Sequence, residues 1–368
     1  MIISCKRQEL QTAVSNVSRA VSSKSSIPAL EGILLKAEEN QISLCGYDLE
    51  LGITTTIEAS VKEKGSVIFS AKIFGDMIRI LPDEWVTISV DEKLNAQILS
   101  GDTSFHIIGI AASEYPELPA VSGEAAVSVP QSLLKSMIRQ TIFAVATNDS
   151  KPVHMGTLFQ AGKNQLRLVA VDGYRLAMRT EPVPTGEEEL EFVVPGKTLS
   201  EVVKLIGDEE QDVSLLVGRR HIIFKINQYA VISRLLDGEF LDYKAAIPTT
   251  VKTEILMPTR RFMEGVERMS LVVNDRLKSP VRCLFQEDAV QLSCETAIGG
   301  ASDRFSIQNN GDELEIGFNN RYLLDALRAS ETDEVKIQLN GSLSPMKIVP
   351  KEGDHFLFLV LPVRLKND

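Results

Sequence analysis

Apolar residues along this chain follow two different spacings. In 32–48 and in 156–172 they occupy alternate positions on either side of a short polar turn, which predicts β-hairpins. In 196–206 they lie three and four residues apart, which predicts a helix with one buried face. The helical spacing recurs, and we predict six helices, over 7–21, 71–80, 131–141, 196–206, 259–270 and 319–329.

The predicted hairpins repeat one another. The segments "GILLKAEENQISLCGYD" (32–48) and "GTLFQAGKNQLRLVAVD" (156–172) share seven identical residues at a constant offset of 124 positions, and "RCLFQEDAVQLSCET" (282–296) is a fainter third copy. A strand that runs into a helix also occurs three times, at 67–81, 192–206 and 316–330. Repeats of this kind indicate a fold built from similar units.

The repeats divide the chain into three parts of about 120 residues, each with the order helix, strands, helix, strands. Two Pro-containing segments, 113–126 and 238–251, separate the parts and are predicted linkers. A chain of 368 residues is also too long for one hydrophobic core. We therefore predict an α+β protein of three similar domains, 1–121, 122–249 and 250–368, each with two helices packed on antiparallel sheets.

The charged residues are unevenly distributed. The chain carries 39 basic and 50 acidic side chains, a net charge of −11, which by itself argues against nonspecific binding to nucleic acid. The six predicted helices nevertheless carry thirteen Lys or Arg and only six acidic residues. Solvated basic residues on one helix are ordinary, but six helices with the same excess would form a positive surface if all faced one side. Such a surface suits a polyanion that is held without reading its sequence.

The sequence offers little for an enzyme, which is the main alternative class. The four histidines (His106, His154, His221 and His355) lack metal-ligand spacing, and the chain has no HExxH, P-loop, GxGxxG after a strand or GxSxG motif. We predict no catalytic residue, metal or cofactor. The four cysteines form no CxxC pair, and no apolar run reaches the roughly 20 residues of a membrane span. We expect a cytoplasmic protein with reduced thiols and no membrane association.

Several short segments lie in an order that resembles a known family. They are "SSIPALEGILL" (25–35), "EYPELP" (114–119), "VDGYRL" (171–176), "DGEFLDYKAAIP" (237–248), "LSPMKIV" (343–349) and "LVLPVRL" (359–365). With the threefold repeat and the charge distribution, they closely resemble the bacterial β sliding clamps, the processivity factors of the replicative DNA polymerase, over the full chain. The resemblance implies a DNA clamp ring fold: a head-to-tail homodimer closed into a ring, with helices lining the hole and sheets outside.

In that family a hydrophobic pocket beside the middle hairpin binds short peptides of the replicative polymerase, the clamp loader, repair polymerases and mismatch-repair proteins. The matching positions here are His154, Val171, Gly173, Tyr174, Arg175, Leu176, Leu241, Ala246, Tyr322, Met346, Leu359, Val360, Leu361, Pro362, Val363 and Arg364. By this match Leu176, Leu361 and Val363 line the floor, Tyr174 offers a rigid ring, and Arg175 offers a donor fork for peptide carbonyls or carboxylates. Other members commonly have different residues at 154 and 174 and a more Met-rich ending, so the peptide preference stays open. Leu359, Leu361 and Val363 also fit an ordinary strand with alternating contacts.

The resemblance further implies contacts with double-stranded DNA, independent of its sequence, and with a second copy of the chain. Helix residues expected to face the DNA are Arg7, Lys72, Arg79, Lys135, Arg139, Lys197 and Lys204, and the matching loop residues are Lys24, Asn148 and Lys151. Ring closure would place Phe105, Ile107 and Ile108 against Leu271 and Val272 of the second copy. The alternative in the binding class is a peptide-binding scaffold that does not encircle DNA.

Overall fold

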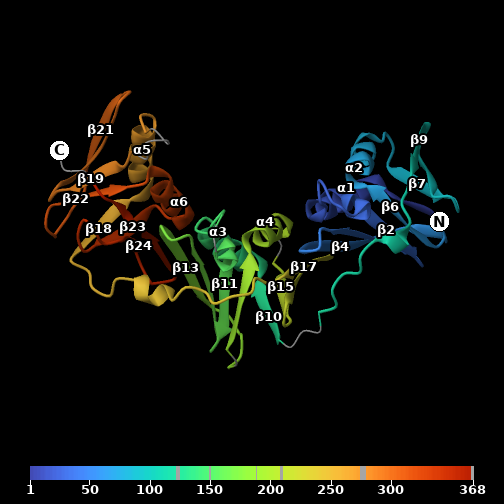
Figure 1. The fold of residues 1–368 in the computed structure, drawn as a ribbon, viewed down its shortest axis with the longest axis horizontal. Coiled ribbons are helices and arrows are strands. Elements are labelled where there is room, and N and C mark those ends of the chain that lie inside the picture. Colours follow the sequence, from blue (N-terminus) through green and yellow to red (C-terminus); the bar gives the residue numbers. More distant parts are fainter. Residues whose placement is uncertain (122–124, 149–150, 188, 208–209, 274–278, 366–368) are drawn as a thin grey trace. The chain divides into compact units, whose positions relative to one another are not determined.

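The computed structural model describes residues 1–121, 125–148, 151–187, 189–207, 210–273 and 279–365. The chain folds into two compact units (Figure 1). Unit 1 comprises Met1–Ser132 and Ser200–Leu235, and unit 2 comprises Leu133–Leu199 and Leu236–Asp368. The middle third of the chain therefore contributes to both units. The two units do not coincide with the three sequence repeats, so they do not test the predicted domain boundaries, which stay a prediction.

The threefold repeat appears in the order of the elements. The first third contains β1 (Ile2–Lys6), α1 (Arg7–Val17), β2 (Gly32–Glu38), β3 (Gln41–Tyr47), β4 (Leu51–Glu58), β5 (Ser60–Glu63), β6 (Gly65–Ser70), α2 (Ala71–Ile80), β7 (Trp85–Val90), β8 (Asn95–Ser100) and β9 (Thr103–Ile108). The second contains β10 (Ala125–Pro130), α3 (Gln131–Ile142), β11 (Gly156–Gly162), β12 (Gln165–Val171), β13 (Arg175–Pro182), β14 (Leu190–Pro195), α4 (Gly196–Leu205), β15 (Asp212–Val217), β16 (His221–Ile226) and β17 (Tyr229–Arg234). The last contains β18 (Thr253–Pro258), α5 (Thr259–Ser270), β19 (Val281–Phe285), β20 (Ala289–Thr296), β21 (Gly299–Ser306), β22 (Leu314–Phe318), α6 (Asn320–Ser330), β23 (Glu334–Leu339), β24 (Met346–Pro350), β25 (Phe356–Val360) and β26 (Pro362–Val363).

The six predicted helices are present within a residue or two of their predicted bounds, except that the first is shorter. It ends at Val17 and continues as a 3-10 turn, Ser18–Ala20. Each third also opens with a strand, β1, β10 or β18, that the sequence pattern did not reveal. These strands are only five or six residues long and run directly into a helix, so they offer too few positions for the alternation to stand out.

In the part of the chain that the structure describes, each unit contains one eight-stranded and one five-stranded sheet. In unit 1 the strand orders are β5-β1-β7-β8-β9 and β10-β15-β16-β17-β4-β3-β2-β6. In unit 2 they are β14-β11-β12-β13-β25-β24-β23-β18 and β21-β20-β19-β22-β26. All pairs are antiparallel, and each large sheet joins strands from two different thirds, through β17 with β4 and through β13 with β25. Helices α1 and α2 lie side by side in unit 1, as α5 and α6 do in unit 2 (Figure 1).

The large sheet of unit 2 is covered by apolar side chains on both faces. On the helix side, Phe356, Phe358 and Val360 of β25 join a core that includes residues of α5 and α6. On the opposite side, Leu357 and Leu359 belong to what we call the outer cluster, formed by Val153, Leu158, Val169, Leu176, Val193, Tyr243, Leu357 and Leu359 with Met178, Leu236, Phe240, Ile247 and Val349 packed against it. A strand buried on both faces reads as a continuous apolar run, which explains "FLFLV".

Candidate functional site

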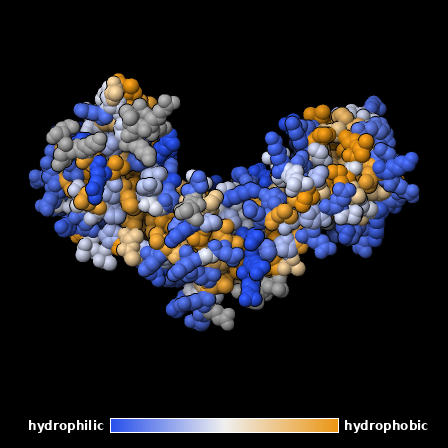
Figure 2. Space-filling view, viewed as in Figure 1, coloured by the Kyte–Doolittle hydropathy of each residue, from blue (hydrophilic) through white to orange (hydrophobic). Residues whose placement is uncertain are grey.

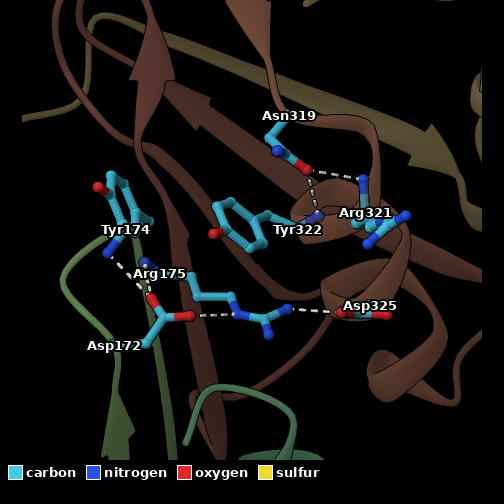
Figure 3. A network of polar contacts seen from close by, with 7 residues as sticks. All are labelled: Asp172, Tyr174, Arg175, Asn319, Arg321, Tyr322 and Asp325. Atoms are coloured by element: carbon cyan, nitrogen blue, oxygen red, sulfur yellow. Dashed lines mark hydrogen bonds and ion pairs between the residues drawn. The ribbon is translucent and has the colours of Figure 1, made fainter. Parts of the chain in front are cut away.

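The turn between β12 and β13 is stabilised by its own aspartate. One carboxylate oxygen of Asp172 accepts hydrogen bonds from the backbone N–H groups of Tyr174 (2.9 Å) and Arg175 (3.0 Å) (Figure 3). Gly173 has φ +84°, a conformation that a side chain would strain. The tight turn leaves Tyr174 outside the sheet, with 59% of its surface exposed.

Arg175 connects this hairpin to α6 within unit 2. Its Nε donates to Asp172 Oδ2 (2.9 Å), and its Nη1 donates to Asp325 Oδ2 (2.5 Å) (Figure 3). The guanidinium carbon lies 4.6 Å from the centre of the Tyr322 ring and 5.6 Å from that of Phe143. Only 12% of the Arg175 side chain is exposed. The donor fork expected to serve a partner peptide is therefore engaged by two carboxylates of this chain.

Two tyrosines stack beside this ion-pair network. The rings of Tyr174 and Tyr322 are 5.8 Å apart, with 22° between their planes. Asn319 caps α6 by accepting hydrogen bonds from the backbone N–H groups of Arg321 (2.9 Å) and Tyr322 (3.3 Å), which fixes the first turn of the helix (Figure 3). Burial and, to a smaller extent, the Asp172 carboxylate raise the pKa of Tyr322. The stacked pair presents an apolar face next to the hairpin.

Several of the expected peptide-binding residues meet on the outer face of the large sheet in unit 2. Leu176 pairs with Val171 on one side and with Leu359 on the other, and residues paired across antiparallel strands share a face. The backbone N–H of Leu361 donates to the Tyr174 carbonyl (2.9 Å), which holds the C-terminal strand against the turn. We call Val171, Leu176, Leu359 and Leu361, with Tyr174 and the linker residues Leu241 and Ala246, the peptide surface. Tyr174, Leu241, Ala246 and Leu361 are its exposed members.

The other expected peptide-binding residues lie around or behind this surface. Met346 and Val360 are fully buried in the core on the helix side, so they support the strands rather than face outward. Pro362 and Val363 form β26, which pairs with β22, and Arg364 is exposed after it. The His154 ring lies edge-on to Phe240, with centroids 5.8 Å apart. Asp325 and Phe143, which position Arg175, were missed because neither is a sequence neighbour of Arg175, and Asp325 lies 150 residues away from it.

The expected DNA-binding residues lie on the surfaces of both units. Unit 1 contains Arg7, Lys24, Lys72, Arg79 and Lys204, and unit 2 contains Lys135, Arg139, Asn148, Lys151 and Lys197. Arg7 and Lys135 are half-buried and the others are exposed. Two of the cations have acidic neighbours on their own helices, Arg79 with Asp76 and Lys204 with Glu201, each at 2.8 Å. Exposed pairs of this kind bind weakly and leave the side chains available to a phosphate.

Among the described strands, the edges of the five-stranded sheets are β5 and β9 in unit 1 and β21 and β26 in unit 2, and β9 and β21 lie nearest the residues expected in the dimer contact. Ile108 at the end of β9 is 78% exposed and Leu271 after α5 is 82% exposed, while Phe105, Ile107 and Val272 are half-buried. Figure 2 shows hydrophobic residues at the surface around α2 and β7, and again at the tip of unit 2 near β21. Exposed edges that carry apolar side chains are uncommon in monomers.

An arginine pair holds α5 against β21 near that tip. The two carboxylate oxygens of Asp303 accept hydrogen bonds from Arg261 Nη1 and Nη2 (2.8 Å each), and Arg268 Nη2 donates to one of them (2.5 Å). The Arg261 hydrogen bonds, followed by that of Arg268, hold the pKa of Asp303 well below its usual range. This pair fixes α5, the helix that ends at Ser270 just before Leu271. It was not expected from the sequence.

The described residues show no arrangement typical of catalysis. Among them, no group of three or more His, Cys, Asp or Glu residues is placed to hold a metal ion. All four cysteines are buried and unpaired, and burial raises the pKa of Cys5 and Cys45 to about 12, so their thiols are unreactive. No helix in the described part of the chain is long and apolar enough to cross a bilayer.

Comparison with known proteins agrees with this picture. Models of the N-terminal, central and C-terminal domains of the DNA polymerase III beta subunit match residues 1–119, 128–242 and 244–364. The chain is 33% identical over 365 residues to the beta sliding clamp of Halalkalibacterium halodurans, covering 95% of this chain and 96% of the relative. It is 31% identical over 374 residues to that of Staphylococcus aureus, covering 99% of each.

Solved structures give the same result. The DNA polymerase sliding clamp of Bacillus subtilis matches with a TM-score of 0.96 at 31% identity, covering 100% of both chains. A sliding clamp from Pseudomonas aeruginosa bound to griselimycin matches with a TM-score of 0.95 at 26% identity, covering 99% of this chain and 100% of the other. With three domain models in order and relatives above 30% identity along the full length, this chain belongs to the bacterial DNA polymerase III beta subunits, the beta sliding clamp family.

Proposed function

We propose that this sliding clamp works as a ring-shaped homodimer that encircles duplex DNA and tethers the replicative polymerase and other partners for processive synthesis. Its role is mechanical: it catalyses no reaction and needs no cofactor. The observation that carries the proposal is the family match along the whole chain, with all three domains in order. The outer edges of β9 and β21, which pair with no strand in the described part of the chain, and the basic residues of the helices support it.

The peptide surface is the proposed docking site for partners. Leu176 and Leu359 form a buried apolar floor, and Tyr174, Leu241 and Leu361 form an exposed rim. Burying one apolar side chain of a partner on such a floor is worth roughly 1.5 to 3 kcal/mol. A short flexible peptide loses conformational freedom on binding, so the net affinity is modest. The replicative polymerase, clamp loader, repair polymerases and mismatch-repair proteins can then exchange at one site.

The homodimer is proposed to form through the two sheet edges. Pairing β9 of one subunit with β21 of the other would satisfy backbone groups that are otherwise open to solvent. It would also remove Ile108 and Leu271, two of the most exposed apolar side chains, from water. Because the two edges differ, the contact is heterologous, and two copies can close into a ring.

Topological linkage is what distinguishes a clamp from a peptide-binding scaffold. The protein, loaded by its clamp loader onto a nicked circular plasmid, should co-elute with the plasmid during gel filtration in high salt. Cutting the plasmid once should release the protein, because a ring can slide off a free DNA end. A protein bound to the surface of the DNA would stay bound after the cut. Equal retention before and after the cut would contradict the ring and favour the scaffold.

A further inference from the structure

A second depression lies on the outer face of unit 2, beyond the peptide surface. It is a groove of about 700 Å³, with Met178, Val349 and Leu357 among its lining residues. All three pack in the outer cluster together with Leu176 and Leu359. The apolar floor of the groove is therefore continuous with the floor of the peptide surface.

The strand register places a lysine next to that floor. Leu176 lies opposite Leu359, and Leu359 lies opposite Lys347 on the next strand. The same row continues to Gln338 and Glu254. Paired residues share a face and neighbouring strands are about 4.8 Å apart, so Lys347 stands about 10 Å from Leu176 across the sheet. An extended peptide rises about 3.3 Å per residue and covers this distance in about three residues.

The groove holds cations that lack a strong counter-ion. Lys347, half-buried, has no carboxylate partner within the described part of the chain. Among the residues that the structure describes, the Arg167 guanidinium donates to two neutral oxygens, those of Thr180 (2.9 Å) and Tyr243 (3.5 Å), and to no carboxylate. Lys336 is 3.8 Å from Glu254, at the far limit of an ion pair.

Few acidic groups oppose these cations. Of the two carboxylates that line the groove, Glu181 is paired with Arg179, and Asp354 lies in the exposed turn before β25. Arg167 and Lys347 are thus partly desolvated cations beside an apolar floor. A carboxylate brought to such a place gains more than it would at an open surface.

We propose that this groove binds acidic residues of partner peptides, placed about three residues from the apolar anchors that occupy the peptide surface. The inference rests on the proposed peptide surface and names a further feature of the partners it selects. The groove suits a nucleic acid strand less well. Its lining offers three cations (Arg167, Lys336 and Lys347) and no exposed aromatic ring on which a base could stack. The acidic residues would add specificity and speed association more than they add affinity.

Three fluorescent peptides test this. The first is the C-terminal tail of the replicative polymerase, and the others are the same tail extended, at the end nearer the groove, by three aspartates or by three asparagines. We expect the aspartate peptide to bind three- to tenfold more tightly than the asparagine peptide in low salt, with the difference shrinking as salt rises. Lys347→Glu should reduce the ratio to one or below. Lys252→Glu is the matched control, because Lys252 is exposed in the same unit, lies outside the groove and changes the net charge equally. It should leave the ratio unchanged.

The outcomes separate the two proposals. If the unextended tail fails to bind, the proposal that the peptide surface is a docking site is wrong, and the groove proposal, which rests on it, is wrong too. If the tail binds but the aspartate and asparagine peptides bind alike, the groove proposal alone is wrong. An aspartate preference that survives Lys347→Glu would place the acidic residues elsewhere. If a single-stranded oligonucleotide displaces the aspartate peptide at low micromolar concentration, and does so only when Lys347 is intact, the groove is a phosphate site and the peptide assignment fails.

Discussion

Arg175 is the residue whose replacement should be most informative. Arg175→Met removes the guanidinium and keeps most of the aliphatic stem. In the wild type this group joins Asp172 at the hairpin turn to Asp325 on α6 and packs over the Tyr322 ring. The substitution would separate two elements that, among the described residues, no other side-chain ion pair connects at this place. We predict that the hairpin and α6 lose their fixed relation while the strands of the sheet remain paired.

The magnitude follows from the two ion pairs. A hydrogen bond to a charged group is worth about 1.5 to 3 kcal/mol. We assign the bond to Asp172 a free energy in the upper part of this range, because the Asp172 side chain is only 12% exposed. The bond to Asp325 is assigned less than the lower limit, because the Asp325 side chain is 37% exposed and water screens the interaction. With the lost contact to the Tyr322 ring, about 3 kcal/mol is expected. This agrees with the cost of about 3 to 5 kcal/mol for breaking one partner out of a buried pair.

Hydrogen exchange measures this locally. A loss of about 3 kcal/mol should speed the exchange of the backbone amides at positions 174 and 175 about 100-fold, since both donate to Asp172. Arg304→Met is the matched control, because its pair with Asp288 is exposed on both sides, and it should cost less than about 0.5 kcal/mol. Trp85, the single tryptophan, lies in unit 1, so its fluorescence during urea unfolding should be the same in all variants. If Arg175→Met exchanges no faster than Arg304→Met, Arg175 does not hold the hairpin.

Three further predictions concern the tip of unit 2, the dimer and the DNA. Asp303→Asn should lower the free energy of unfolding of unit 2 by about 2 kcal/mol, because it replaces a charged acceptor of two arginines. Since the pKa of Asp303 is lowered in the folded state, this difference should be complete above the unfolded value of 3.8 and should shrink as pH falls below it, as urea titrations at several pH values would show. Leu271→Ala with Val272→Ala should shift the protein towards monomer in sedimentation at low concentration, and an unchanged dimer would count against the proposed interface. Binding of unloaded protein to duplex DNA should weaken with salt at a log-log slope of about −0.9 per phosphate contact, and replacing Arg7, Arg79, Lys197 and Lys204 by Ala should flatten it; a hundredfold preference for one duplex sequence would be incompatible with this assignment.

The amino-acid sequence by itself determined the family and most of the local structure, the short opening strands β1, β10 and β18 excepted. Alternating apolar residues around Asn40, Asn164 and Asp288 place three hairpins, and apolar residues three and four apart place six helices. Both spacings report the geometry of a single element, so neighbouring residues contain all the information needed. The repeat and the short segments shared with sliding clamps were also readable, because both are properties of residue order alone.

Only the tertiary structure decided how the thirds are joined and which way the strands face. The run "FLFLV" in β25 has no alternation of apolar and polar residues. The sequence therefore does not show that Leu359 faces the peptide surface while Val360 packs in the core on the opposite side of the sheet. Its pairing with β13 joins strands more than 170 residues apart in the sequence. Likewise, Arg175 was recognised as important from its motif, but its partner Asp325 lies 150 residues further along the chain. The pairing of distant strands and charges depends on the packing of the whole unit, and a local pattern does not contain it.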